Sequence, residues 1–291
     1  MKTIEAFSRP YPAKLLLFGE YTVLSGSQAL AVPLHQWSGG WIMDNQLDLH
    51  ALPEYYDWLG QAGIISEITL HLMREDMERG WRYKSDIPIG YGVGSSGALV
   101  AALYDRYVVS KEEEAVANAA GIMAKMESYF HGSSSGMDPL VSYSQQAVWK
   151  DDRGAFHLVE DTGWPMEWKI YLLDSRTGRT TGNLVQAYKL KLEGDDFNQK
   201  LQRELIPMVD HAIHFYLSSG VSMLEECIQV ISQFQRRYFA NMIPEEVKQK
   251  WDELSAHRGV YVKLCGAGGG GYFLIINTQG MQLDGQGLIQ V

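Results

Sequence analysis

A glycine-rich loop ahead of a helix constrains this chain more than any other segment. Residues 88–98 read Pro-Ile-Gly-Tyr-Gly-Val-Gly-Ser-Ser-Gly-Ala, and a helix of small residues is predicted over residues 99–107. The first backbone N–H groups of a helix have no partner within it, and the helix dipole adds partial positive charge at that end. Because glycines and serines leave these groups uncovered, the loop predicts an anion site, most often one for phosphate.

Several kinds of phosphate loop share this composition. Gly92, Gly94 and Gly97 match the Gly-x-Gly-x-x-Gly pattern of dinucleotide-binding sites. Such a site also needs an acidic residue at the end of an apolar strand about 20 positions later. Here that position falls in residues 111–114, which form a polar helix start and not the end of a strand. A Walker A loop needs a lysine, and a eukaryotic protein-kinase loop needs a later His-Arg-Asp; neither is present. A tight turn before a close-packed helix stays open as the plain alternative.

Composition bounds the class of protein. The 291 residues suffice for one large domain or two ordinary ones, with 46% hydrophobic and 21% charged residues. A formal net charge of −10 without any basic run argues against a nucleic-acid or membrane partner. The two cysteines, Cys227 and Cys265, make no disulfide framework. Residues 1–10 lack a signal-peptide core and the apolar runs are short, so we expect a cytoplasmic protein.

Apolar periodicity predicts both strands and helices along the chain. Strands are expected over residues 13–18, 30–33, 147–149, 169–173, 260–264 and 272–276, and helices over residues 64–79, 115–130, 198–217, 222–239 and 245–257. Pro207 should kink or split the helix in which it lies. The polar stretch 150–165 is the predicted boundary between domains of residues 1–165 and 166–291.

A second glycine run lies between the last two predicted strands. Residues 266–271 carry five glycines, whereas a hairpin turn needs only two. We therefore expect its backbone to approach a ligand or another loop, with a plain hairpin as the alternative.

Three charged residues are candidates for chemistry, although each has a plainer alternative. Glu127 shares a helix face with Met123 and Phe130, where a carboxylate needs either a metal ion or a basic side chain at the rim. Asp138 precedes a proline at a helix start, which also fits an N-cap. Lys14 lies ahead of an apolar strand and, taken alone, would be a surface lysine.

Together these segments resemble the GHMP kinases, a family of small-molecule kinases. The first family motif corresponds to residues 12–26, the second to residues 88–98 and the third to residues 263–271. Residues 131–138, His-Gly-Ser-Ser-Ser-Gly-Met-Asp, are similar to the acidic loop of the mevalonate kinases within that family. All lie in the family's order. The resemblance implies an α+β fold of two domains, the N-terminal one like ribosomal protein S5 domain 2 and the C-terminal one ferredoxin-like, with the active site between them.

The resemblance also implies ATP and Mg²⁺ as cofactors and assigns roles to residues. Asp138 would act on the substrate hydroxyl as base or orienting acceptor, and Lys14 would stabilise the alkoxide. Mg²⁺ would be held by Glu127 with Ser95 or Ser96. The ATP phosphates would lie on the loop residues Gly92, Val93, Gly94, Ser95, Ser96 and Gly97. The implied substrate-binding residues are Glu20, Tyr21, His131, Arg179, Thr181, Gly268 and Gly269. Phosphoryl transfer then needs alignment and charge neutralisation more than covalent help.

The resemblance indicates the type of reaction more closely than it indicates which molecule accepts the phosphate. The acidic loop and the four-glycine third motif resemble mevalonate kinases, which predicts mevalonate or a related hydroxy acid as substrate. Gly19-Glu20-Tyr21 and Gly97, where mevalonate kinases usually have alanine, look more like phosphomevalonate kinase, and Ser134 replaces a common proline. Phosphomevalonate kinase, another kinase of the family, a non-catalytic ligand sensor and a NAD(P)-binding protein remain alternatives. The sequence leaves the oligomeric state open, with a homodimer as one candidate.

Overall fold

The long strand β2 organises the first of two antiparallel sheets. The computed structural model describes residues 9–47, 52–108, 116–178 and 182–291. The first sheet contains β1 (Tyr11–Phe18), β2 (Ala29–Met43), β3 (Trp81–Ser85), β4 (Ala147–Lys150) and β5 (Phe156–Val159). One edge of β2 pairs with β1, and the other pairs with β4 and β3 at its opposite ends. Strand β5 pairs with β4 inside the polar stretch 150–165, so that stretch continues the first sheet rather than forming only a linker.

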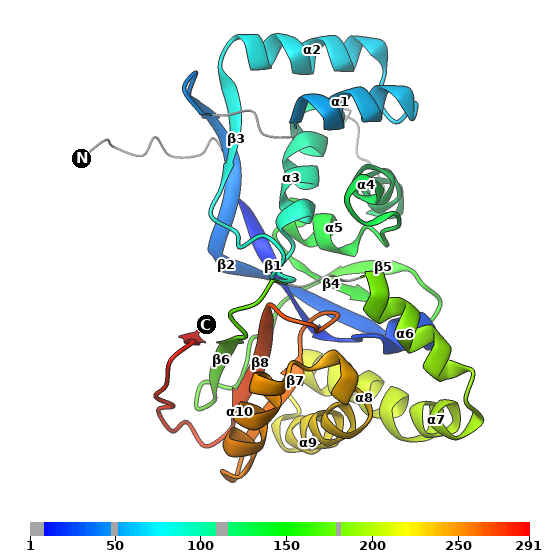
Figure 1. Ribbon diagram of the computed structural model, residues 1–291, viewed down its shortest axis with the longest axis vertical. Helices are drawn as coiled ribbons and strands as arrows, with labels where there is room; N and C mark the ends of the chain where they lie inside the picture. Colours follow the sequence, from blue (N-terminus) through cyan, green and yellow to red (C-terminus); the bar gives the residue numbers. More distant parts are fainter. Residues whose placement is uncertain (1–8, 48–51, 109–115, 179–181) are drawn as a thin grey trace.

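Helices cover both faces of this sheet (Figure 1). On one side lie α1 (Leu52–Gln61), α2 (Glu67–Glu78), α3 (Ser95–Leu103), α4 (Val116–His131) and α5 (Met137–Ser144). Helices α3 and α5 pack on β1 and β2, and α8 reaches the same two strands from the second half of the molecule. The helix predicted over residues 64–79 is α2 alone, because the hydroxyl of Ser66 caps it by accepting from Thr69 N at 3.1 Å.

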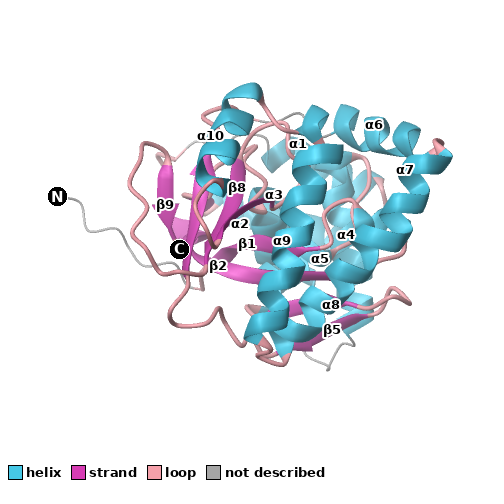
Figure 2. Cartoon of the chain, turned by 90° about the horizontal axis from the view of Figure 1, so that it is seen from below, coloured by secondary structure: helices cyan, strands magenta, loops and turns pink. Residues whose placement is uncertain are grey.

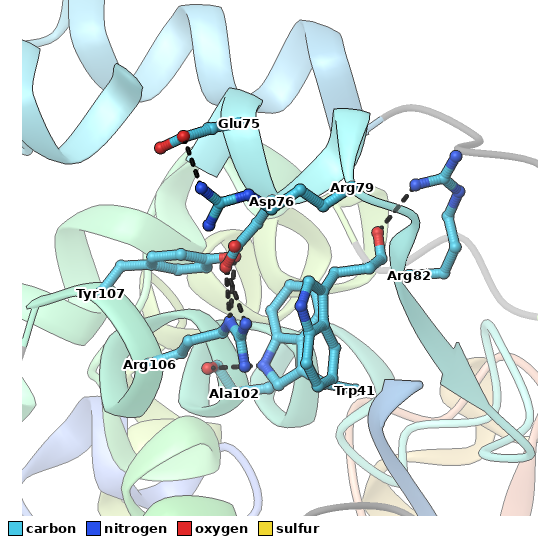
Figure 3. A network of polar contacts seen from close by, with 9 residues as sticks. Trp41, Glu75, Asp76, Arg79, Arg82, Ala102, Arg106 and Tyr107 are labelled. Carbon is cyan, nitrogen blue, oxygen red and sulfur yellow. Dashed lines mark hydrogen bonds and ion pairs between the residues drawn. The ribbon is translucent and has the colours of Figure 1, made fainter. Parts of the chain in front are cut away.

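The far end of α3 is anchored by a polar network, shown in Figure 3. There α3 passes into a π-helical turn, Tyr104–Val108, and Ala102 O accepts a hydrogen bond from Trp41 Nε1 at 3.1 Å. The Arg106 guanidinium lies 4.1 Å from the Trp81 ring centroid and binds Asp76 of α2 at 2.7 Å. These contacts fix the axis of the helix that begins at the glycine loop.

The second sheet has the order β7-β8-β6-β9, with every neighbouring pair antiparallel. Its strands are β6 (Lys169–Asp174), β7 (Val260–Leu264), β8 (Tyr272–Asn277) and β9 (Leu288–Gln290). These elements follow the β-α-β-β order of a ferredoxin-like unit, as expected. Residues 278–287, where such a unit has its second helix, form no helix here.

Five helices belong to the second half of the chain. They are α6 (Gly182–Leu192), α7 (Asp195–Lys200), α8 (Ile206–Leu217), α9 (Val221–Tyr238) and α10 (Glu245–Ser255). Two of them, α9 and α10, pack on strand β7 of the second sheet. A π-helical segment, Leu201–Leu205, separates α7 from α8, and Pro207 stands in the first turn of α8, so the predicted split is found. Short 3₁₀ turns occupy Thr22–Ser25 and Ala240–Met242.

One continuous apolar core joins the two halves of the molecule. Figure 2 shows the helices of the second half gathered beside both groups of strands. Tyr21, just after β1, contacts the rings of Tyr188 and Phe239 with centroids 4.9 and 5.4 Å apart. The predicted boundary at 165/166 falls between the last strand of the first sheet and β6, and it stays a prediction. Within the described residues, no helix is long and apolar enough to cross a bilayer.

Candidate active site

The glycine loop is pinned against β1 at the N-terminus of α3. Gly94 is the N-cap of α3 and has φ 80°, a conformation that favours glycine. Lys14 N donates to Val93 O at 2.9 Å, and a Cβ on Gly94 would lie 2.7 Å from Lys14 Cγ. The loop therefore brings the first turn of α3 directly beside the Lys14 side chain.

Lys14 and Asp138 form an ion pair at this point. Lys14 Nζ lies 3.0 Å from Asp138 Oδ2, and their side chains are 4% and 36% exposed. Helix α5 begins at Met137 with Gly136 as its N-cap, so Asp138 stands in the first turn and is not the cap. The lysine is buried while the carboxylate remains accessible. Such a pair can meet a bound hydroxyl from the carboxylate side.

Gly97 sets how closely α3 approaches α5. A Cβ on Gly97 would lie 2.9 Å from Asp138 C and 3.0 Å from Pro139 N, closer than real Cβ atoms normally come to backbone. Glycine at this position therefore allows the backbone of Asp138 to lie against α3. Mevalonate kinases usually have alanine at this position, and the close approach of the Asp138 backbone gives a local steric reason for glycine here.

Glu127 is a buried carboxylate held by hydroxyls. It is 3% exposed, its Oε1 accepts from Ser96 Oγ at 3.0 Å, and its Oε2 accepts from Ser134 Oγ. Burial, and then the charge of Asp138, raise the pKa of Glu127 to about 7, against the opposing effect of the two hydroxyls and Lys14. In the described part of the chain no arginine or lysine forms an ion pair with Glu127, so the rim alternative is not what the structure shows.

Glu127 and Ser96 fit a magnesium ion. Mg²⁺ is usually held by one or two carboxylates together with waters and substrate phosphates, and hard oxygen ligands suit it. A buried carboxylate without a full counter-charge, next to a serine hydroxyl in the first turn of α3, is such a donor set. The described residues contain no group of three or more His, Cys, Asp or Glu side chains able to hold a metal by themselves. Of the two candidate serines, Ser96 is the one that contacts Glu127.

The second glycine run meets the first. Tyr272 N, at its end, donates to Tyr91 O at 3.3 Å, and Gly269 N donates to Met242 O at 2.7 Å. Tyr21 Oη donates to Ala267 O at 2.5 Å. The run therefore joins the glycine loop of residues 88–98 to the segment that contains Tyr21, rather than making only a hairpin. It contains Gly268 and Gly269, whose substrate contacts stay predictions.

The remaining predicted residues fall in three different places. His131, at the end of α4, lies with Nε2 3.0 Å from Ser96 Oγ and so borders the site. Glu20 points into the interior, where it pairs with Lys263. Arg179 and Thr181 lie outside the described residues.

Two residues escaped the sequence reasoning. Lys263 has a fully buried side chain and binds both the Glu20 carboxylate and Leu264 O. Burial raises the pKa of Glu20, while the charge of Lys263 acts to lower it. Ser134 holds Glu127 and also accepts from Gly136 N at 3.0 Å, which clamps the acidic loop. The only sequence signal for Ser134 was that it replaces a common proline.

Known proteins resemble this chain in sequence and in fold. Residues 64–146 match the family model described as GHMP kinases N terminal domain. Over 158 residues the chain is 28% identical to a mevalonate kinase from Thermococcus gammatolerans, an alignment that covers 45% of this chain and 47% of that protein. The chain thus matches about half the length of this curated relative.

Solved structures share the whole fold. A mevalonate kinase from L. major in complex with R-mevalonate superposes with a TM-score of 0.63 at 15% identity, covering 94% of this chain and 89% of that one. A Streptococcus pneumoniae phosphomevalonate kinase with phosphomevalonate and AMPPNP gives 0.64 at 16%, covering 96% and 93%. A Lactococcus lactis galactokinase with galactose gives 0.63 at 13%, covering 93% and 85%. At these identities the likeness establishes the fold.

Proposed function

We propose that this protein transfers phosphate from ATP to the hydroxyl group of a small molecule. The match to the GHMP kinase N-terminal domain and the fold shared with such kinases support this proposal. The observation that carries the proposal is the Lys14–Asp138 pair, 3.0 Å apart, beside the first turn of α3. A phosphate-binding helix N-terminus and an acid–base pair at one place are what an in-line phosphoryl transfer requires.

Each residue of the site has a role that follows from its position. Asp138, with 36% of its side chain exposed, accepts or orients the proton of the acceptor hydroxyl, and Lys14 stabilises the negative oxygen that results. The uncovered N–H groups of α3 bind the transferring phosphates. Glu127 and Ser96 would hold Mg²⁺, which supplies charge neutralisation on the phosphate oxygens when bound. A positioned base of this kind contributes about 10²–10⁴-fold in rate.

Mevalonate is the acceptor we propose. The acidic loop and the third motif support it, together with the partial identity to a mevalonate kinase. Phosphomevalonate is the second candidate, because Tyr21 and Gly97 follow the pattern of phosphomevalonate kinases and one such structure superposes equally well. A ligand sensor would not need Lys14, Asp138 and Glu127 brought together, which weighs against that alternative.

An ADP-release assay identifies the acceptor. The full chain is incubated with ATP and Mg²⁺ and with mevalonate, phosphomevalonate, homoserine or galactose in turn. We expect the highest kcat/KM with mevalonate. A strong preference for phosphomevalonate or a sugar would overturn the acceptor assignment, and the absence of ADP release with every acceptor would favour the sensor.

A further inference from the structure

The acidic loop, residues 131–138, folds back along helix α4, and Figure 1 shows α5 beside that helix. Gly136 has φ 80°, and a Cβ on it would lie 2.2 Å from Ala120 O, so the backbone of the loop lies directly on α4. Two residues earlier, the half-buried Ser134 donates through Oγ to Glu127 Oε2. Ala120 and Glu127 lie about two turns apart on one face of α4. The loop is therefore held on α4 at two points, one of which is the carboxylate.

The Ser134 hydroxyl connects two helices of the site. Its hydrogen is donated to Glu127 on α4, and its oxygen accepts from Gly136 N at 3.0 Å. Gly136 is the N-cap of α5, the helix that carries Asp138 in its first turn. A serine hydroxyl has a single hydrogen, so the contact with the carboxylate fixes the direction in which that hydrogen points. Ser134 therefore ties the carboxylate proposed to bind Mg²⁺ to the helix of the proposed base.

The other hydroxyl on Glu127 comes from a different element. Ser96 Oγ donates to Glu127 Oε1 at 3.0 Å and lies 3.0 Å from His131 Nε2. It stands in the first turn of α3, where the proposed function makes it a metal ligand. Ser134 donates to the other carboxylate oxygen, Oε2. Because the two serines use different oxygens, Ser134 can hold Glu127 while Ser96 and Glu127 both serve the metal.

We propose that Ser134 is a positioning residue for the metal site, whose hydroxyl holds the Glu127 carboxylate in the orientation that binds Mg²⁺. This role rests on the proposed function, because the Mg²⁺ belongs to that reaction. Carboxylates that bind metals are themselves held by hydrogen bonds, and loss of such a partner costs about 10–100-fold in metal affinity or activity. Proline, which is common at this position in the acidic loop of mevalonate kinases, has no hydroxyl. The resemblance to those kinases therefore does not imply this contact.

Calorimetric titration of the full chain with AMPPNP, an ATP analogue that is not hydrolysed, tests the role of Ser134. Each titration is run with excess Mg²⁺ and again with EDTA, and the ratio of the two dissociation constants measures the contribution of the metal. We expect Ser134→Ala to reduce this ratio by about tenfold or more. The dissociation constant in EDTA should stay unchanged, because the glycine loop is not altered. Ser134→Thr keeps the hydroxyl and should restore most of the ratio.

Ser144→Ala is the matched control. The Ser144 hydroxyl likewise accepts from a backbone N–H two residues later, Gln146 N at 3.3 Å, and donates to Leu140 O at 2.8 Å, but at the other end of α5. This variant should keep the wild-type ratio.

Two results would overturn the role of Ser134 and leave the proposed kinase standing, provided that Mg²⁺ tightens AMPPNP binding to the wild type. One is an equal ratio in Ser134→Ala and Ser144→Ala, and the other is a loss in Ser134→Ala that Ser134→Thr does not recover. A wild type that gains no affinity from Mg²⁺ would contradict the metal site itself, and the role of Ser134 with it.

Discussion

Two buried lysines with carboxylate partners show how the same pair of groups serves two purposes. Lys14 on β1 and Lys263 on β7 are 4% and 0% exposed. Their partners differ: the Asp138 side chain is 36% exposed, whereas that of Glu20 is 1% exposed. Exposure of the carboxylate, rather than burial of the lysine, distinguishes the pair that we propose to react from the pair that is closed on both sides.

The closed pair joins the two sheets. Glu20 follows β1 of the first sheet and Lys263 belongs to β7 of the second, and no water or substrate can reach the contact. A buried ion pair of this kind gains little overall, but breaking it leaves an uncompensated charge in the interior. The comparison predicts that a variant at Lys263 loses mainly stability, whereas a variant at Lys14 loses mainly turnover.

Lys263→Met should give the largest effect on stability. Glu20 would remain buried without its counter-charge, and we expect a loss of about 3–5 kcal/mol in the free energy of unfolding. Lys14→Met should cost much less stability, because the partly exposed Asp138 can be hydrated, yet it should abolish most turnover. Urea unfolding and the ADP-release assay measure the two properties.

The double variant Glu20→Gln/Lys263→Met is the control for this effect, since it removes both charges and should recover most of the lost stability. An unfolding free energy for Lys263→Met equal to that of Lys14→Met would break the distinction between the two pairs.

Glu127→Gln sharpens the comparison, because Glu127 is buried like Glu20 but lacks a lysine of its own. The pKa of Glu127 is about 7 in the folded protein, whereas the ordinary value for a glutamate is 4.5. Between pH 4.5 and pH 7 the folded state therefore binds a proton that the unfolded state has released. The contribution of Glu127 to the free energy of unfolding is therefore fully present below pH 4.5 and is lost as the pH rises through 7. The loss amounts to about 3 kcal/mol at 1.36 kcal/mol per pKa unit.

Urea unfolding between pH 4.5 and 8, without Mg²⁺ or nucleotide, measures the difference. The Gln variant should be as stable as the wild type near pH 4.5 and more stable by up to about 3 kcal/mol at pH 8. It should also lose activity, because it supplies no carboxylate to the proposed Mg²⁺ site. Parallel pH curves for the two proteins would contradict the raised pKa.

Gly97→Ala should give the smallest effect on the open pair. The new Cβ would press on the backbone of Asp138 and displace it by a fraction of an ångström, and we expect kcat to fall about 10–100-fold through misalignment. Gly121→Ala in α4 is the matched control, because a Cβ there has nothing within 4 Å. The control should keep its activity and gain up to about 1 kcal/mol of stability. Equal kcat in both variants would remove the steric role of Gly97.

The elements predicted well were those with strong periodicity and clear ends. Helix α9 and strands β7 and β8 lie within one residue of their predicted bounds, since apolar spacing defines the helix and the glycine run separates the strands. Helix α1 was missed because proline, glycine and aromatic residues give its sequence little helix propensity. Strand β5 was missed because it is short and only partly buried.

The site could be predicted only where a motif names the residue type. Lys14, Glu127 and Asp138 were grouped by resemblance, and the structure brings them together. Lys263 alternates with apolar residues in its strand, a pattern that normally places a lysine in solvent. Its burial depends on Glu20, 243 positions away, and no local pattern contains that information.

Turnover of Asp138→Asn tests the central claim most directly. Asparagine keeps the size of the side chain and a contact to Lys14 but cannot accept the proton of the acceptor hydroxyl. We expect nucleotide affinity to stay close to that of the wild type, while kcat in the ADP-release assay falls by about 10²–10⁴-fold. Near-normal turnover in this variant would contradict the assignment of the Lys14–Asp138 pair as the reacting centre.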